Sequence, residues 1–422
     1  MADRRSINPV DSDASGDAVV IVDRLLAGAV AAGASDIHVD PAANECVVRL
    51  RVDGMLRHHL TLTPAVGRSV VNRLMVLARL LTYRLDVPQE GRATVTVGDR
   101  KIDARVAMMP TTFGLRCVVR LPNDLDLPTA QPRSIDRLGL PDAALAALQA
   151  FLKSDSGLLL VVGPAGSGKT TTLHAALLHL AQTRPDLSLI SIEDPVERHL
   201  PGVTQIEVTP FGELTFDRAL RSVLRQDPQV LAIGEIRDAE TASLALQAAL
   251  SGHRLLCTLH AGSPAGAIAR LLEMGLEPYR LAGAISAVVN QRLVRKLARK
   301  FGSSGVSVVF PNNDQVTADR GVAPAQHDAS STNPSEHRTD GSSPTYQGRA
   351  LLAECATMTP DLRRRILDRS DVDSLAQGIA SARAPTLLDH ARQLIAQGLT
   401  DAGEVERVLG VSPVSPTPKE ST

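Results

Sequence analysis

The chain has 422 residues, of which 44% are hydrophobic and 22% charged, so it is long enough for two or three globular domains. Its net charge of −1, the lack of Trp and the small numbers of Tyr (three) and Phe (six) argue against a general nucleic-acid-binding surface. The four cysteines form no CxxC pair, no apolar run approaches the roughly 18 residues of a membrane span, and the N-terminus lacks a signal-peptide pattern, so we expect a cytoplasmic protein.

The first part of the chain predicts an α+β domain. Residues 1–16 are polar and are expected to form a disordered tail, followed by the domain itself at residues 17–122. Apolar periodicity predicts helices at Asp17–Ala32 and Gly67–Tyr83. Strands are expected at Glu45–Val52, Arg92–Val97, Lys101–Met109 and Leu115–Leu121. Residues 123–137 have few apolar anchors and are interpreted as a linker.

Between residues 138 and 301 the pattern changes to strands that alternate with helices. The run Gly157–Val162 is too apolar for a half-exposed strand and suits the centre of a parallel sheet. Further strands are expected at Leu187–Ile192, Val230–Gly234 and Arg254–Leu259. Helices are expected at Thr170–Ala181, Phe216–Arg225, Ala239–Leu250 and Ala265–Met274. This alternation predicts an α/β sheet that binds its ligand at the carboxyl ends of the strands.

The last part of the chain is more varied. Residues 302–345 contain no Leu or Ile and are rich in Ser, Asn, Asp, Thr and Pro, so we expect a disordered insertion. Helical signals return from Leu351 to Leu409, which predicts a small helical C-terminal region at residues 346–410. Residues 411–422 form a Pro- and Ser-containing tail that is also expected to be disordered.

A phosphate-binding loop follows the first strand of the α/β region, because the segment there matches G-x4-G-K-[ST]. Its glycines let successive backbone N–H groups converge on phosphates, and the following helix directs its positive end at them. Lys169 would reach the β- and γ-phosphates, and the Thr170 hydroxyl would bind Mg2+. The expected nucleotide-binding residues are Gly163, Pro164, Ala165, Gly166, Ser167, Gly168, Lys169, Thr170 and Thr171.

An acidic residue follows each of two apolar strands. An enzyme with a P-loop needs such a residue to hold Mg2+ or its waters and to polarise the attacking water. Glu235 follows Val230–Gly234, and Glu193 with Asp194 follows Leu189–Ile192. An acid that ends an apolar strand in a chain with a P-loop favours a functional role over a solvated surface role.

Two histidines flank the strand Arg254–Leu259. A lone His is more often structural than catalytic, so on the residues alone His253 and His260 fit either role. No third ligand lies near them at a recognisable spacing, so neither is expected to bind a metal.

Four blocks in this order resemble the ATPases of type II secretion systems and type IV pili. They are the P-loop, an aspartate box, a Walker B block and a histidine box, at Gly163–Thr170, Ile192–Glu197, Leu224–Asp238 and Ser251–His260. Three earlier blocks resemble the second N-terminal domain of that family, at Ala34–Pro41, Arg51–Leu56 and Pro88–Arg92. The resemblance covers residues 18–300 and resumes at Tyr346–Arg365. It implies a RecA-like ATPase domain, an N-terminal α+β domain that is PAS-like, and a small helical C-terminal region.

The resemblance also implies roles for single residues. Glu235 and Thr170 would handle Mg2+, and His260 would contact the γ-phosphate. Glu193 would act as, or assist, the base that activates water. The family's arginine fingers, which reach the nucleotide from the N-terminal domain or from a neighbouring subunit, match Arg92, Arg105, Arg221 and Arg225.

At the level of the assembly, the resemblance implies a homo-hexamer that hydrolyses ATP to ADP and phosphate. Such a ring would associate peripherally with the inner membrane and act on a platform protein, together with cytoplasmic assembly proteins, to power type II secretion or type IV pilus assembly. No nucleic-acid partner is expected. Two alternatives remain open: a pilus retraction motor, and a nucleotide-binding regulatory or assembly subunit with little hydrolysis of its own.

One departure from the family concerns metal binding. Secretion and pilus-extension members often carry a tetracysteine zinc module between the ATPase core and the last helices, but the corresponding stretch here contains no Cys, so no zinc is expected. The cationic segment Arg292–Lys300, which leads into that stretch, is interpreted as a solvated helix face.

Overall fold

The computed structural model describes residues 17–122, 134–208, 213–298 and 345–413. The expected N-terminal tail, most of the expected linker and insertion, and residues 414–422 lie outside this range. By its packing the chain divides into two compact units, Met1–Leu293 with Leu351–Leu387 and Val294–Ala350 with Leu388–Thr422. Among the described residues, no helix is both long enough and apolar enough to cross a membrane.

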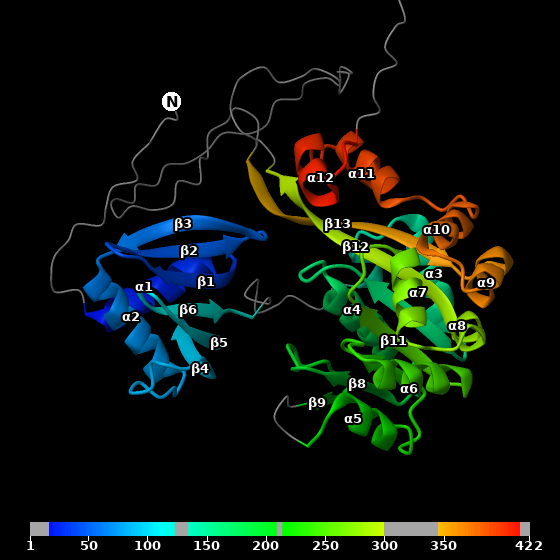
Figure 1. Ribbon diagram of the computed structural model, residues 1–422, viewed down its shortest axis with the longest axis horizontal. Coiled ribbons are helices and arrows are strands. Elements are labelled where there is room, and N and C mark those ends of the chain that lie inside the picture. The colour runs from blue at the N-terminus through cyan, green and yellow to red at the C-terminus, as the bar shows by residue number, and fades with distance from the viewer. Residues whose placement is uncertain (1–16, 123–133, 209–212, 299–344, 414–422) are drawn as a thin grey trace, which may run out of the picture. The chain divides into compact units, whose positions relative to one another are not determined.

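The first unit begins with an antiparallel sheet of six strands in the order β3-β2-β1-β6-β5-β4 (Figure 1). Along β5, alternate residues such as Ile102 and Ala104 are buried while their neighbours are exposed, so one face of the sheet belongs to the core. Two helices contact each other and this sheet. The elements are α1 (Ala18–Ala31), β1 (Ala34–Pro41), β2 (Cys46–Val52), β3 (Met55–Leu62), α2 (Pro64–Leu77), β4 (Gln89–Val97), β5 (Arg100–Thr111) and β6 (Gly114–Arg120).

The second sheet has seven strands in the order β13-β12-β7-β11-β10-β8-β9, and the pairs from β12 to β9 are parallel. Every residue of β7, β10 and β11 is buried, which explains the continuous apolar runs of β7 and β10. The strands are β7 (Gly157–Val162), β8 (Leu189–Glu193), β9 (Thr204–Glu207), β10 (Val230–Ile233), β11 (Arg254–Leu259), β12 (Ile285–Leu297) and β13 (Tyr346–Thr357). The predicted α/β fold is therefore confirmed.

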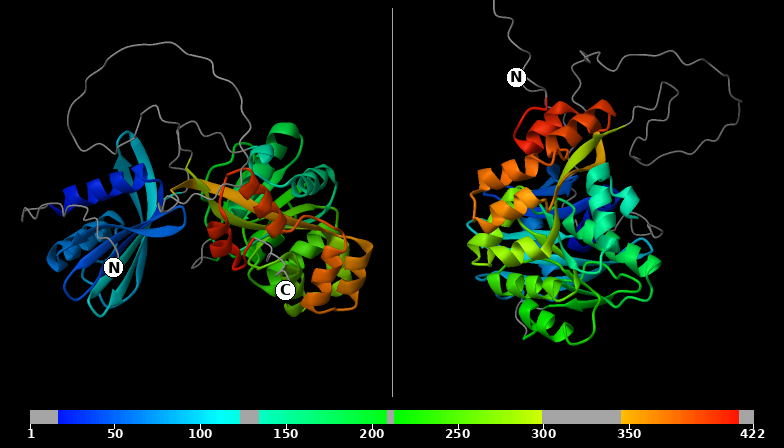
Figure 2. Two further views of the ribbon diagram at one scale, coloured as in Figure 1. Left: turned by 90° about the horizontal axis from the view of Figure 1, so that it is seen from above. Right: turned by 90° about the vertical axis from the view of Figure 1, so that its right-hand side faces the viewer.

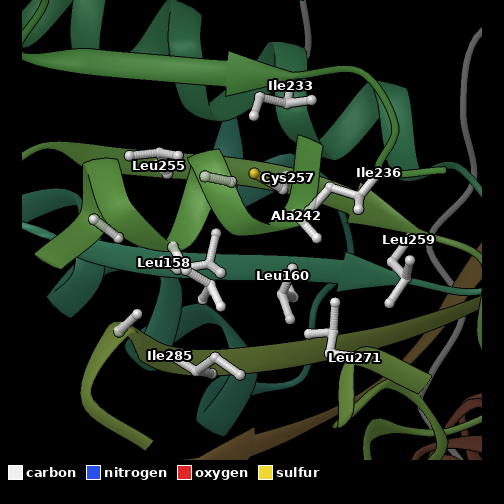
Figure 3. Packing of buried hydrophobic residues seen from close by; sticks show 14 of the residues in the cluster. Leu158, Leu160, Ile233, Ile236, Ala242, Leu255, Cys257, Leu259, Leu271 and Ile285 are labelled. Atoms are coloured by element: carbon white, nitrogen blue, oxygen red, sulfur yellow. The ribbon is translucent and has the colours of Figure 1, made fainter. Parts of the chain in front are cut away.

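Helices cover both faces of this sheet. Successive side chains of a strand point to opposite faces, so apolar strands need a covering layer on each side. Leu158 and Leu160 of β7 pack with Leu255 and Cys257 of β11 under α6 and α7 (Figure 3), whereas Leu159 faces a second core beneath α3 and α4. The helices are α3 (Asp142–Lys153), α4 (Lys169–Thr183), α5 (Phe216–Val223), α6 (Ala239–Leu250), α7 (Pro264–Glu273), α8 (Pro278–Ala284), α9 (Pro360–Leu367) and α10 (Val372–Ala380).

The structure corrects three local expectations. Leu351, where helix was expected to begin, lies in strand β13, because a short apolar run does not distinguish a helix from a buried strand. The segment Arg292–Leu297 was expected to be a solvated helix face, but it forms the end of strand β12, and Arg295 is largely buried. The expected linker ends in a short 3-10 helix, Ile135–Arg137, whose Ile135 packs in the core beneath α3 and α4.

The second unit contains the end of β12, the start of β13 and two helices, α11 (Leu387–Ala396) and α12 (Ala402–Leu409), which lie side by side (Figure 2). Glu404 of α12 is fully buried and accepts hydrogen bonds from Arg295 and Arg407 at 2.7–3.0 Å. The Arg295 guanidinium lies 4.0 Å from the centre of the Tyr346 ring, whose hydroxyl donates to Asp401. This ion-pair cluster joins the strand ends to α12.

Candidate functional site

The P-loop connects β7 to α4 at the carboxyl edge of the parallel sheet. Gly163, Gly166 and Gly168 have φ angles of 149°, 73° and 90°, which side-chain-bearing residues rarely adopt. A Cβ on Gly163 would lie 2.5 Å from the Gln291 carbonyl oxygen and 2.5 Å from the Ser167 hydroxyl. The loop therefore needs glycine both for its backbone angles and for space.

Polar groups inside the loop fit a phosphate ligand. Lys169 Nζ donates to the carbonyl oxygens of Gly163 and Pro164, each at 2.9 Å, so its ammonium lies within the loop. Burial lowers the Lys169 pKa, and the nearby negative charge of Glu235 opposes that effect. The Ser167 hydroxyl is buried and has no hydrogen-bond partner among the described residues. A buried cation beside an unsatisfied hydroxyl is suited to an anion with several acceptor oxygens.

Glu235 and His260 meet at the ends of β10 and β11. His260 Nε2 lies 2.8 Å from Glu235 Oε1, while Arg237 Nε donates to Glu235 Oε2 at 2.8 Å. Arg237 also donates to Asp194 at 2.9 Å, so the aspartate box is connected to the same cluster. The structure thus brings together three of the sequence-predicted regions.

Glu193, the last residue of β8, is held differently, with only 3% of its surface exposed. It accepts hydrogen bonds from Ser191 at 2.7 Å and Gln205 at 3.0 Å on Oε1, and lies 2.9 Å from His174 Nε2 on Oε2. Burial alone would raise the Glu193 pKa, but the hydrogen bonds from His174, Gln205 and Ser191 outweigh it and keep the pKa below its ordinary value. Its carboxylate is therefore ionised and accepts three hydrogen bonds from protein donors, two on Oε1 and one on Oε2.

The four predicted arginine fingers are all exposed. Arg92 and Arg105 are exposed and face each other across β4 and β5 of the first sheet. Arg221 of α5 pairs with Glu240 at 2.6 Å, and Arg225 is exposed just beyond the same helix. Within the described part of the chain, no hydrogen bond or ion pair joins any of the four to the P-loop or to its acidic residues.

His253 contacts the backbone of helix α6. Its Nδ1 lies 3.0 Å from the carbonyl oxygen of Ala248, at the end of α6. Of the two histidines that flank β11, it is therefore His260, and not His253, that contacts a predicted catalytic acid.

Residues that the sequence did not reveal also line the site. Gln291 of β12 is buried and donates to the Thr172 hydroxyl at 3.0 Å, next to the P-loop. Arg292 donates to the Gly262 carbonyl at 2.8 Å, so β12 also holds the loop that follows His260. The polar residues Asn290, Gln291 and Arg292 interrupt the apolar strand β12 and could have pointed to the site, but no strand was expected there.

Metal binding by protein side chains alone is not indicated. Within residues 17–122, 134–208, 213–298 and 345–413, no group of three or more His, Cys, Asp and Glu residues could hold a metal ion. Thr170 in the first turn of α4 and Glu235 are the predicted Mg2+ residues. Mg2+ is commonly bound through one or two protein groups together with waters and substrate phosphates, so the two residues suit that kind of site.

Comparisons with known proteins identify the family of this chain. The family model described as Type II/IV secretion system protein matches residues 12–407. The putative type II secretion system protein E of Escherichia coli K12 is 35% identical over 96% of this chain and 79% of its own length. Type II secretion system protein E of Pseudomonas aeruginosa PAO1 is 37% identical over 92% of this chain and 74% of its own.

Two solved structures share the fold. The pilus retraction motor PilT with bound ADP has a TM-score of 0.60 at 25% identity, covering 94% of this chain and 98% of its own. The Legionella pneumophila ATPase DotB has a TM-score of 0.64 at 21% identity, covering 93% of this chain and 94% of its own. The family match over residues 12–407 and the two type II secretion system proteins that are 35–37% identical show that the chain belongs to the Type II/IV secretion system protein family.

Proposed function

We propose that this chain is the ATP-hydrolysing motor subunit of a type II secretion or type IV pilus assembly system. The observation that carries the proposal is the Glu235–His260 pair, whose side chains lie 2.8 Å apart after two strands of the sheet that also carries the P-loop, because an acid and a polar side chain at that edge suit work on a bound phosphate. The type II secretion proteins that cover most of the chain at 35–37% identity support the choice of system.

The P-loop backbone from Gly163 to Thr170 and the Lys169 ammonium would hold the phosphates of ATP. Thr170 and Glu235 would hold Mg2+, which when bound neutralises phosphate charge. His260, about two-fifths exposed, would contact the γ-phosphate. A carboxylate whose pKa is lowered is a weak base near neutral pH, so Glu193 would assist by orienting the attacking water more than by taking its proton.

The assembly would be a homo-hexamer. The exposed positions of Arg92, Arg105, Arg221 and Arg225 support this proposal, because arginine fingers can act from a neighbouring domain or subunit. The ring would work in the cytoplasm, bound peripherally to the inner membrane through a platform protein and cytoplasmic assembly proteins. The N-terminal domain, PAS-like by resemblance, would move relative to the ATPase domain as nucleotide is bound and hydrolysed.

Two alternative functions remain. PilT is described as a pilus retraction motor, but its 25% identity is well below that of the type II secretion proteins, which favours secretion or assembly over retraction. A regulatory subunit with little hydrolysis is disfavoured, because Lys169, Glu193, Glu235 and His260 are all present.

The test is the steady-state ATPase rate of the purified full chain as a function of its concentration. We expect the rate per subunit to rise with concentration, since neighbouring subunits complete the sites, and Glu235→Gln to lower it by about 10²-fold or more. Glu273→Gln, an exposed residue at the end of α7, is the matched control and should match the wild type. A wild type that binds ATP but hydrolyses none at any concentration would contradict the proposal and favour the regulatory subunit.

A further inference from the structure

His174 is a buried histidine in α4, the helix that begins in the P-loop. Its side chain is 10% exposed, and its Nε2 lies 2.9 Å from Oε2 of Glu193. Because the Glu193 carboxylate is ionised and can only accept, the His174 ring must donate this hydrogen bond. The pair joins α4 to the end of β8.

The other two partners of Glu193 belong to the sheet. Ser191 lies two residues earlier in the same strand, and Gln205 lies on the neighbouring strand β9. Gln205 is itself fixed, since its side chain accepts from the Leu200 N–H at 2.7 Å and donates to the Arg198 carbonyl at 2.8 Å. These two donors would therefore keep Glu193 in place relative to the sheet, whatever happens at the P-loop.

His174 is the partner of Glu193 that comes from the nucleotide-binding side. It follows Lys169 by five residues in α4, about 7.5 Å along the helix axis. Its hydrogen bond thus connects the helix whose first turn binds phosphate to the acid at the end of β8. Loss of this one bond would leave Glu193 attached to the sheet but no longer tied to the P-loop helix.

We propose that His174 is a positioning residue for ATP hydrolysis, which ties the Glu193 carboxylate to the P-loop helix so that the acid keeps its place relative to the phosphates. This inference rests on the proposed ATPase function. It adds a residue to the reaction that does not touch the nucleotide and acts through Glu193. The expected signature is a loss of turnover without a loss of nucleotide affinity, because the P-loop itself is unchanged.

The experiment compares His174→Leu and His174→Gln in the full chain, with His179→Gln on the same helix as the control. We expect His174→Leu to lower kcat by about tenfold while the dissociation constants of ATP and ADP change less than about twofold. The amide nitrogen of Gln can take the place of Nε2, so His174→Gln should recover most of the rate. His179→Gln should match the wild type.

A second comparison shows whether His174 acts through Glu193. When His174→Leu is added to Glu193→Gln, we expect little further loss of kcat, because the two residues form one unit. Wild-type kcat in folded His174→Leu, or a loss confined to nucleotide affinity, would overturn the inference and leave the ATPase function intact. A wild type without hydrolysis would overturn both. If His174→Leu does not fold, His174→Asn, whose shorter side chain cannot reach Oε2, replaces it.

Discussion

The P-loop edge of the parallel sheet and the C-terminal unit each bury a glutamate, but they surround it with different partners. Glu193 is surrounded by His174, Ser191 and Gln205, of which only the histidine can carry a charge. Glu404 instead receives two guanidinium groups, from Arg295 and Arg407.

The partners of the two glutamates differ in charge. Arginine keeps its charge at any accessible pH, so the cluster around Glu404 is permanently paired and joins β12 to α12. Ser191 and Gln205 are neutral donors, which hold the Glu193 carboxylate in place without cancelling its charge. We therefore expect changes at the nucleotide edge to alter turnover, and changes at Glu404 to alter stability.

The largest expected effect is on turnover. Lys169→Ala removes the buried ammonium from the P-loop and should lower the ATPase rate by about 10³-fold, because stabilisation of phosphate charge is lost. Lys153→Ala, an exposed residue at the end of α3, is the control. The measurement is the ATPase rate beside the melting temperature, which should stay within a few degrees of the wild type. Retention of a tenth of the activity would contradict the assigned role of Lys169.

The second effect is on stability. Glu404→Gln leaves Arg295 and Arg407 without their carboxylate and should destabilise the C-terminal unit by about 3 kcal/mol, the cost of breaking a buried ion pair. Hydrogen exchange of the α12 amides measures this locally. Glu406→Gln, exposed on the same helix, is the matched control. Unchanged protection in Glu404→Gln would show that the cluster does not hold α12.

The smallest expected effect is the pH dependence of the stabilisation that Glu404 contributes. Burial alone would raise the Glu404 pKa, but the hydrogen bonds from Arg407 and Arg295 lower it from 4.5 to about 2. The unfolded chain therefore takes up a proton at higher pH than the folded chain, so this stabilisation is complete above pH 4.5 and is lost as the pH falls towards 2.

The unfolding free energies of the wild type and Glu404→Gln should accordingly differ most at neutral pH and converge as the solution is acidified to about pH 3. Denaturant unfolding, followed by a probe in the C-terminal unit, gives both values. A difference that stays constant over this range would mean that Glu404 titrates normally in the folded protein.

Much of the site could be predicted because it follows from local sequence and one rule of topology. An apolar strand followed by an acid or a glycine loop is visible in the chain, and the carboxyl ends of parallel strands share one edge of a sheet. The contact between Glu235 and His260 confirms that the separate motifs come together. The chemical roles of these residues and of the arginines stay predictions.

Other features depended on contacts between distant segments. Strands β12 and β13 were not expected, because their apolar runs fit helix or strand equally well until the sheet pairs them. The prediction of a solvated helix face at the cationic end of β12 was wrong for the same reason. Arg295 is buried there by its ion pair with Glu404, which lies 109 residues further along the chain.

By itself the sequence determined the P-loop, the strands that end in Glu193 and Glu235, and the alternation that makes an α/β sheet, since each depends on residues that are neighbours in the chain. Only the tertiary structure decided which partners surround each acid. Burial makes an unpaired carboxylate costly, and the donors that satisfy it come from whichever element packs there. For Glu193 one such element is the P-loop helix, which supplies His174, and no motif in the sequence predicts that contact.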